Sequence, residues 1–139
     1  MSVFMSLLKH EILNKNPKRT SEIALRVFFN IMTKWEVTKK EQTNLLGQSS
    51  EQLFKGWKQD TIIALSDGTL LRISYVLGIY KALGTLFSDK KLAHAWITRE
   101  NQIFDNSSAL DFILKDSANN LPQVRNYLDS QITDEIIKN

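Results

Sequence analysis

One long apolar stretch with helical spacing constrains the fold of this chain more than any other feature. The segment LSDGTLLRISYVLGIYKALGTLF, residues 65–87, carries apolar side chains at intervals of three and four residues. That spacing gathers them on one side of an α-helix, which other elements must then cover. We predict a helix over 69–87, preceded by a turn at ALSDG. Its apolar stripe consists of Leu70, Ile73, Val76, Leu77, Tyr80, Leu83 and Leu86.

The same three- and four-residue spacing recurs along most of the chain, so we predict an all-α fold. A first helix is expected from Ser21, as its N-cap, to Trp35. Thr38 and Glu41 have the spacing of a capping box for a second helix that ends at Gly47. The other expected helices cover 49–57, 90–97, 108–115 and 121–130.

Size, cysteine content and charge limit which kinds of protein this chain can be. A chain of 139 residues without cysteine can bury a core but can hold neither disulfides nor a cysteine metal site. No apolar run is long enough to span a membrane, so we expect a cytoplasmic protein without membrane contact. The net charge is +3 in residues 1–33, +1 in 34–60 and −1 in 61–139. A mildly basic front half is compatible with a polyanionic partner, but charge on a small domain is more often an ordinary solvated surface.

The segment TKKEQTNLLGQSSEQLFKGW, residues 38–57, has the form of a helix-turn-helix unit. Its glycine allows the chain to reverse, and the second helix opens on serines. The polar side chains that follow the turn could reach base edges, and the lysines could reach phosphates. The candidate DNA-binding residues are Lys39, Gln48, Ser49, Ser50, Gln52, Lys55 and Lys58.

A purely structural role for this segment stays open. Thr43 stands where such motifs usually have alanine or glycine, and Gln48 stands where they usually have an aliphatic residue. The second helix has no arginine before Trp57, and it carries Glu51, which phosphate would repel. Two short helices around a glycine also occur in bundles that never contact DNA.

No residue pattern indicates catalysis, a cofactor or a metal. His10 and His94 are the only histidines, and a lone histidine is more often packed or exposed than a ligand. The glycines are too scattered to cradle a phosphate. The serines in GQSSEQ and DNSSAL are explained as helix caps. We therefore expect a protein that is not an enzyme.

Three motifs in a fixed order resemble a known family. The first runs from Arg72 to Phe87 and is followed by a second at Trp96, Ile97, Asn101 and Phe104. The third comprises Val124, Arg125, Tyr127 and Leu128. Together they resemble antitoxins of the Xre/MbcA/ParS type, the partners of RES-domain toxins in bacterial type II toxin–antitoxin systems. The resemblance covers residues 24–131.

The resemblance implies an N-terminal helix-turn-helix bundle followed by a small helical toxin-binding domain. Residues 1–60 would form the helix-turn-helix bundle, and residues 61–87 a connecting turn and core helix. Residues 88–139 would form the toxin-binding domain. The toxins of this family attack NAD, and the antitoxin covers the entrance to their pocket. Trp96 and Phe104 would hold the intervening loop from inside. The implied toxin-binding residues are Arg99, Glu100, Asn101, Gln102, Ile103 and Arg125.

The chain departs from the family pattern after Phe104. Asn106 takes the place of a glycine, and Ala109 stands where the family has a proline. Asparagine tolerates the left-handed conformation, so we expect the turn to survive. Arg125 could instead form a salt bridge within its own helix.

The function that we expect is an antitoxin that also binds operator DNA and represses its own operon. Phe28 and Phe29 are adjacent in the first helix, which suggests a homodimer formed through the N-terminal half. Two alternatives are a DNA-binding regulator without a toxin and a helical interaction protein whose helix-turn-helix serves only dimerisation.

Overall fold

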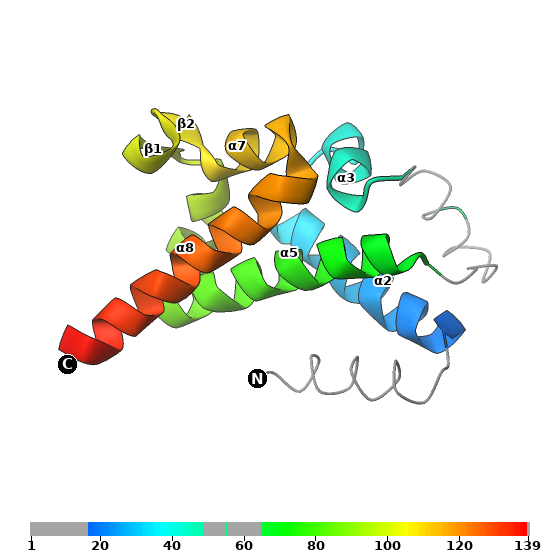
Figure 1. Cartoon of the computed structure of the whole chain (residues 1–139), viewed down its shortest axis with the longest axis horizontal. Helices are drawn as coiled ribbons and strands as arrows, with labels where there is room; N and C mark the ends of the chain where they lie inside the picture. Colours follow the sequence, from blue (N-terminus) through cyan, green and yellow to red (C-terminus); the bar gives the residue numbers. More distant parts are fainter. Residues whose placement is uncertain (1–16, 49–54, 56–64, 139) are drawn as a thin grey trace.

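The computed structural model describes residues 17–48, 55 and 65–138, and this part of the chain is almost entirely helical (Figure 1). The predicted all-α class is confirmed, with one small two-stranded hairpin in addition. The helices are α2 (Pro17–Trp35), α3 (Lys39–Leu46), α5 (Asp67–Leu86), α6 (Lys90–Ala95), α7 (Ala109–Lys115) and α8 (Ser117–Lys138). The short elements are the 3-10 helices η1 (Trp96–Thr98) and η2 (Gln102–Phe104) and the strands β1 (Glu100–Asn101) and β2 (Ser107–Ser108).

Helix α2 begins one turn earlier than predicted, so the assignment of Ser21 as its N-cap is wrong. The helix starts at Pro17, whose missing N–H costs nothing in a first turn. Ser21 is buried within the helix, where its hydroxyl donates to Pro17 O at 2.8 Å. The same hydroxyl accepts a hydrogen bond from Leu65 N at 2.8 Å. The serine thus connects α2 to the segment before α5.

Helix α3 has the ends that the sequence predicts. Thr38 accepts from Glu41 N at 3.2 Å, and Glu41 accepts from Thr38 N at 2.9 Å, which completes the capping box. Gly47 ends the helix with a left-handed φ of 73°. The predicted following helix at 49–57 lies outside the described residues, except for Lys55, which is helical and exposed.

Helix α5 is the centre of the fold and packs against α2 and α8 (Figure 1). Ser66 caps it by accepting from Thr69 N at 3.2 Å. Ile73, Val76, Leu77 and Leu83 of the predicted stripe are buried, and the other three are partly buried. Ile79 and Ala82 are buried as well. The single predicted stripe therefore accounts for only part of the buried surface of α5, because α2 and α8 cover this helix from different sides.

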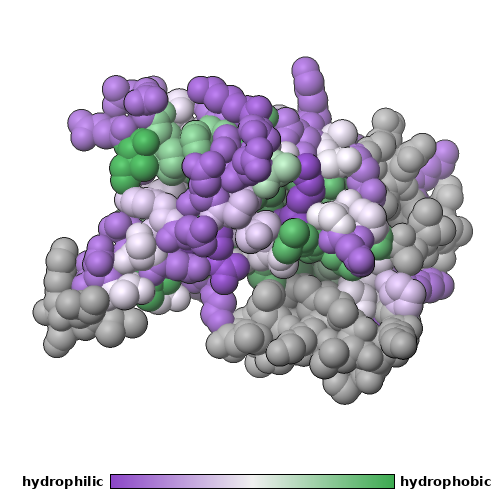
Figure 2. Space-filling view, viewed as in Figure 1, coloured by the Kyte–Doolittle hydropathy of each residue, from purple (hydrophilic) through white to green (hydrophobic). Residues whose placement is uncertain are grey.

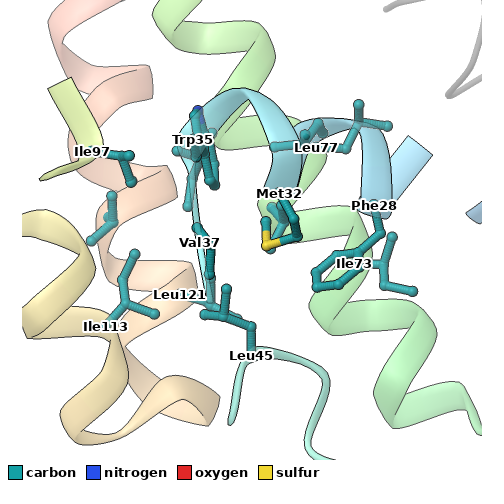
Figure 3. Close-up of a cluster of buried hydrophobic side chains, with 14 of the residues drawn as sticks. Phe28, Met32, Trp35, Val37, Leu45, Ile73, Leu77, Ile97, Ile113 and Leu121 are labelled. Carbon is teal, nitrogen blue, oxygen red and sulfur yellow. The ribbon is translucent and has the colours of Figure 1, made fainter. Parts of the chain in front are cut away.

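One hydrophobic core extends from α2 to α8. Figure 3 shows side chains of α2 beside Ile73 and Leu77 of α5, and a second group around Ile113 of α7 and Leu121 of α8. Both groups belong to the same cluster of buried residues. The domain boundaries at residues 60 and 87 stay a prediction, but the described elements on both sides of residue 87 share this core.

The last helix is longer than predicted. Helix α8 begins at Ser117 rather than Leu121 and continues to Lys138 instead of ending at Ser130. Asp116 precedes it and accepts through its carbonyl from Asn120 N at 2.8 Å. Pro122 lies inside the helix rather than in its first turn. A proline one turn further in still leaves most of the early hydrogen bonds intact.

The aromatic pair in α2 is covered within the chain. Phe28 is buried, and Phe29 is partly buried with its ring edge-on to Phe28 at 5.7 Å. These two rings therefore leave little apolar surface for a second copy, and the homodimer stays a prediction. No helix in the described ranges is long and apolar enough to cross a membrane.

Candidate interaction site

The loop between η1 and α7 is folded into a small closed structure. Strands β1 and β2 pair antiparallel, with Glu100 opposite Ser108 and Asn101 opposite Ser107. Helix η2 forms the tip between them. Two-residue polar strands give no periodic signal, which is why the sequence did not predict the hairpin.

Two residues in the left-handed conformation close this hairpin. Asp105 has a φ of 54° and Asn106 a φ of 67°. The N–H of Asn106 donates to Asn101 O at 3.0 Å. The expectation that Asn106 accommodates the left-handed conformation at this turn is confirmed, since its short side chain tolerates positive φ.

Phe104 fixes the hairpin to the core. Its side chain is 8% exposed, and its ring lies 6.1 Å from that of Trp96, edge-on. Two further rings contact it, Phe112 at 5.1 Å and Tyr127 at 6.4 Å. The prediction that Trp96 and Phe104 hold this loop from inside is confirmed.

The residues before Phe104 form the outer surface of the hairpin. Arg99, Glu100 and Gln102 are exposed, and the apolar side chain of Ile103 is 53% exposed. Figure 2 shows hydrophobic atoms at this end of the molecule with hydrophilic atoms around them. We call Arg99–Ile103 the hairpin surface.

Asn101 differs from its neighbours on the hairpin surface. It is half-buried, and its Oδ1 accepts from Ile103 N at 3.1 Å. The oxygen of this side chain is therefore already engaged within the loop, and its contact with a partner stays a prediction. Asn101 holds the shape of η2, and the other four residues supply the exposed groups.

Arg125 is held by α5 and by its own helix. Its Nε lies 3.1 Å from Asp129 Oδ2, an ion pair one turn along α8. The guanidinium rests on Gly78, where a Cβ would overlap it. Arg125 and Asp129 also line a groove of about 360 Å³ between α5 and α8. The salt bridge that the sequence left open is therefore present, beside an open groove.

The candidate DNA-binding residues are only partly described. Lys39 and Lys55 are exposed, and Gln48 is half-buried after the end of α3. Ser49, Ser50, Gln52 and Lys58 lie outside the described residues. The structure therefore shows the first helix and the turn of the predicted unit, and its second helix stays a prediction.

Arg72 is a structural residue that the sequence reasoning did not single out. Its Nη1 donates to Asn44 O at 3.2 Å, to Leu45 O at 3.4 Å and to Ser117 Oγ at 2.6 Å. Ser117 also donates to Asn44 O at 3.0 Å. Arg72 thus neutralises the carbonyl end of α3 and joins it to the start of α8. In the sequence, only the position of Arg72 at the start of the first motif pointed to a role for this residue.

The described residues contain no cluster of three histidine or acidic side chains that could hold a metal. The exposed groups of the hairpin surface include the apolar side chain of Ile103 and the charged side chains of Arg99 and Glu100.

Comparison with known proteins gives one relative. No protein-family model matches the chain, and no solved structure matches it. The "Uncharacterized protein y4oB" of Sinorhizobium fredii (strain NBRC 101917 / NGR234) is 38% identical over 107 residues, which cover 77% of this chain and 82% of y4oB. Because identity at this level extends over most of both chains, the protein belongs to the y4oB family.

Proposed function

We propose that this protein is an antitoxin that binds a RES-type, NAD-consuming toxin through its hairpin surface and blocks the toxin's pocket. The observation that carries the proposal is the pair Ile103 and Phe104. The apolar side chain of Ile103 is half exposed, and that of Phe104 is buried among three aromatic rings.

This arrangement suits a protein contact. A half-exposed isoleucine among polar neighbours can be buried in a partner's pocket, while the polar groups form the rim. The buried ring of Phe104 and the hydrogen bonds of Asn101 fix the hairpin before binding, which lowers the entropy lost in the complex.

The mechanism requires no chemistry by the antitoxin. A helical domain that buries about 800 Å² on each side can bind tightly if a few side chains are well packed. Once such a contact covers the entrance to the toxin's pocket, NAD cannot enter. Arg125 would add a second, charged contact if its ion pair with Asp129 opens toward the partner.

Operator binding is the second role that we propose, and the cap of α3 supports it. The helix ends on a left-handed Gly47, as the first helix of a helix-turn-helix unit does, and Arg72 anchors that end. Binding through Lys39, Gln48, Ser49, Ser50, Gln52, Lys55 and Lys58 would weaken steeply as salt rises. A shift of operator DNA that does not depend on salt would contradict this role.

The experiment that tests the toxin contact is co-purification with the product of the neighbouring reading frame. The informative variant is Ile103→Asp, which would place a charge inside the proposed interface. Leu71→Asp is the matched control, because Leu71 is an apolar residue of the same exposure, 54%, on α5. We expect Ile103→Asp to lose the complex and Leu71→Asp to keep it. Equal behaviour of the two variants would reject the hairpin surface.

A further inference from the structure

Side chains from three helices meet around the hydroxyl of Tyr80. Lys34 of α2 donates from Nζ to Tyr80 Oη at 3.0 Å, and its Nζ lies 5.3 Å from the centre of the tyrosine ring. His94 of α6 stacks on the same ring at 5.8 Å with an interplanar angle of 22°, and its Nε2 is 3.4 Å from the hydroxyl. The hydroxyl therefore lies between an ammonium group and an imidazole.

These groups stand at the edge of a pocket of about 330 Å³. This volume is at the lower end of the range for small-molecule sites, about 300–1,000 Å³. The remaining lining is mostly apolar, with two polar residues at the start of α6. It consists of Leu83, Gly84, Phe87, Ser88, Lys90 and Ala93.

The polar side of this pocket is basic. Lys34 and Lys90 contribute positive charge, and none of the described lining residues is acidic. Asp89 is next to Lys90 in the chain, but its Oδ1 accepts from Lys91 N at 2.8 Å and from Leu92 N at 3.4 Å. Its carboxylate is thus used to cap α6. Two cations without a lining acid favour a bound anion.

Gly84 gives an independent reason to regard the pocket as a site. It lies within α5, where glycine costs stability relative to alanine. At Gly78, in the same helix, a close side chain explains the glycine, because a Cβ would overlap Arg125. At Gly84 a Cβ would meet no atom within 4 Å. Among the described residues, no close contact requires this glycine, and it leaves space open at the pocket.

We propose that this pocket binds a small organic anion, with its negative group between Lys34 and Lys90 and its apolar part against Leu83, Gly84 and Phe87. Tyr80 Oη and His94 Nε2 lie on the same side as Lys34 and would complete the hydrogen bonds to the anion. The site is built from α2, α5 and α6 and does not depend on the antitoxin proposal, since no toxin is needed to fill it.

The test uses phenyl phosphate as the probe and the full-length protein. The chain has two histidines, so the imidazole resonances of His94 can be assigned with a His10→Gln variant. Phenyl phosphate should shift the His94 resonances in a saturable way, and uncharged benzyl alcohol should not. Lys34→Gln should weaken the binding about 10-fold or more, as expected for the loss of a charge-assisted hydrogen bond.

Gly84→Leu is the decisive variant, because it fills the pocket from a position with free space. Thr85→Leu is its matched control, on the neighbouring residue, which lines the groove beside α8 instead. We expect Gly84→Leu to abolish the shift and keep the helical circular dichroism, while Thr85→Leu keeps both. Absence of a saturable shift in the unmodified protein would overturn the proposal. So would an unchanged shift in folded Gly84→Leu.

Discussion

The guanidinium of Arg125 on α8 lies directly on the backbone of Gly78 on α5, so the two helices meet where a side chain is absent. A Cβ at position 78 would overlap the guanidinium, so the end of Arg125, which is paired with Asp129, would have to move. Gly84 has free space around it. Gly78 and Gly84 should therefore respond differently to the same substitution.

Gly84→Ala should raise the free energy of unfolding by about 0.5–1 kcal/mol, because alanine favours the helix. Gly78→Ala should give no such gain, since the displaced arginine offsets it. In an Arg125→Ala background, Gly78→Ala should recover the gain, and urea unfolding of the four variants measures the coupling. Equal gains at both glycines would show that Arg125 does not rest on Gly78 in solution.

Arg72→Met should lower the free energy of unfolding by about 2 kcal/mol, because hydrogen bonds from a charged group to the carbonyls of α3 are lost. Arg99→Met is the matched control on the exposed hairpin and should change it by less than about 0.5 kcal/mol. Chemical denaturation gives both values. A loss at position 72 no greater than at position 99 would remove the proposed role of Arg72.

Phe104→Ala should destabilise the protein by about 3 kcal/mol, since a buried ring is lost from a cluster of four. Ile103→Ala, at the adjacent exposed position, should change stability by less than about 0.5 kcal/mol. It should nevertheless weaken the toxin complex. Calorimetric unfolding measures the effect on stability, and a binding titration measures the effect on the complex. A loss of stability in Ile103→Ala equal to that in Phe104→Ala would contradict the structure.

Ser21→Ala should cost about 1–3 kcal/mol, because it leaves the buried N–H of Leu65 without its hydrogen-bond acceptor. Ser74→Ala is a suitable control, since the Ser74 hydroxyl only donates to Leu71 O in its own helix and is partly exposed. Thermal unfolding followed by circular dichroism compares them. A negligible effect at Ser21 would mean that water replaces the serine.

Helix ends that depend only on neighbouring residues were predictable from the sequence. The capping box at Thr38, the left-handed Gly47 and the cap at Ser108 depend on neighbouring residues only, and all three are confirmed. Ser21 and Arg72 were not predictable in this way, because each acts on a distant segment: Ser21 on Leu65 and Arg72 on Asn44 and Ser117.

At the hairpin surface, too, only part of the structure was predictable from the sequence. The family resemblance implied that Trp96 and Phe104 hold the loop from inside, and the contact between their rings agrees with it. The involvement of Asn101 in the loop was not evident, since its acceptor role depends on the turn geometry of η2. The ion pair of Arg125 follows from four-residue spacing, whereas its contact with Gly78 depends on how α8 crosses α5.

The proposed protection of NAD through contact with a RES-type toxin can be tested by measuring cellular NAD during toxin induction. A RES-type toxin is co-expressed with the unmodified chain, with Ile103→Asp or with Leu71→Asp. We expect NAD to be preserved by the unmodified chain and by Leu71→Asp, and to fall with Ile103→Asp. A fall in NAD with the unmodified chain present at equal or higher amount than the toxin would contradict the antitoxin function.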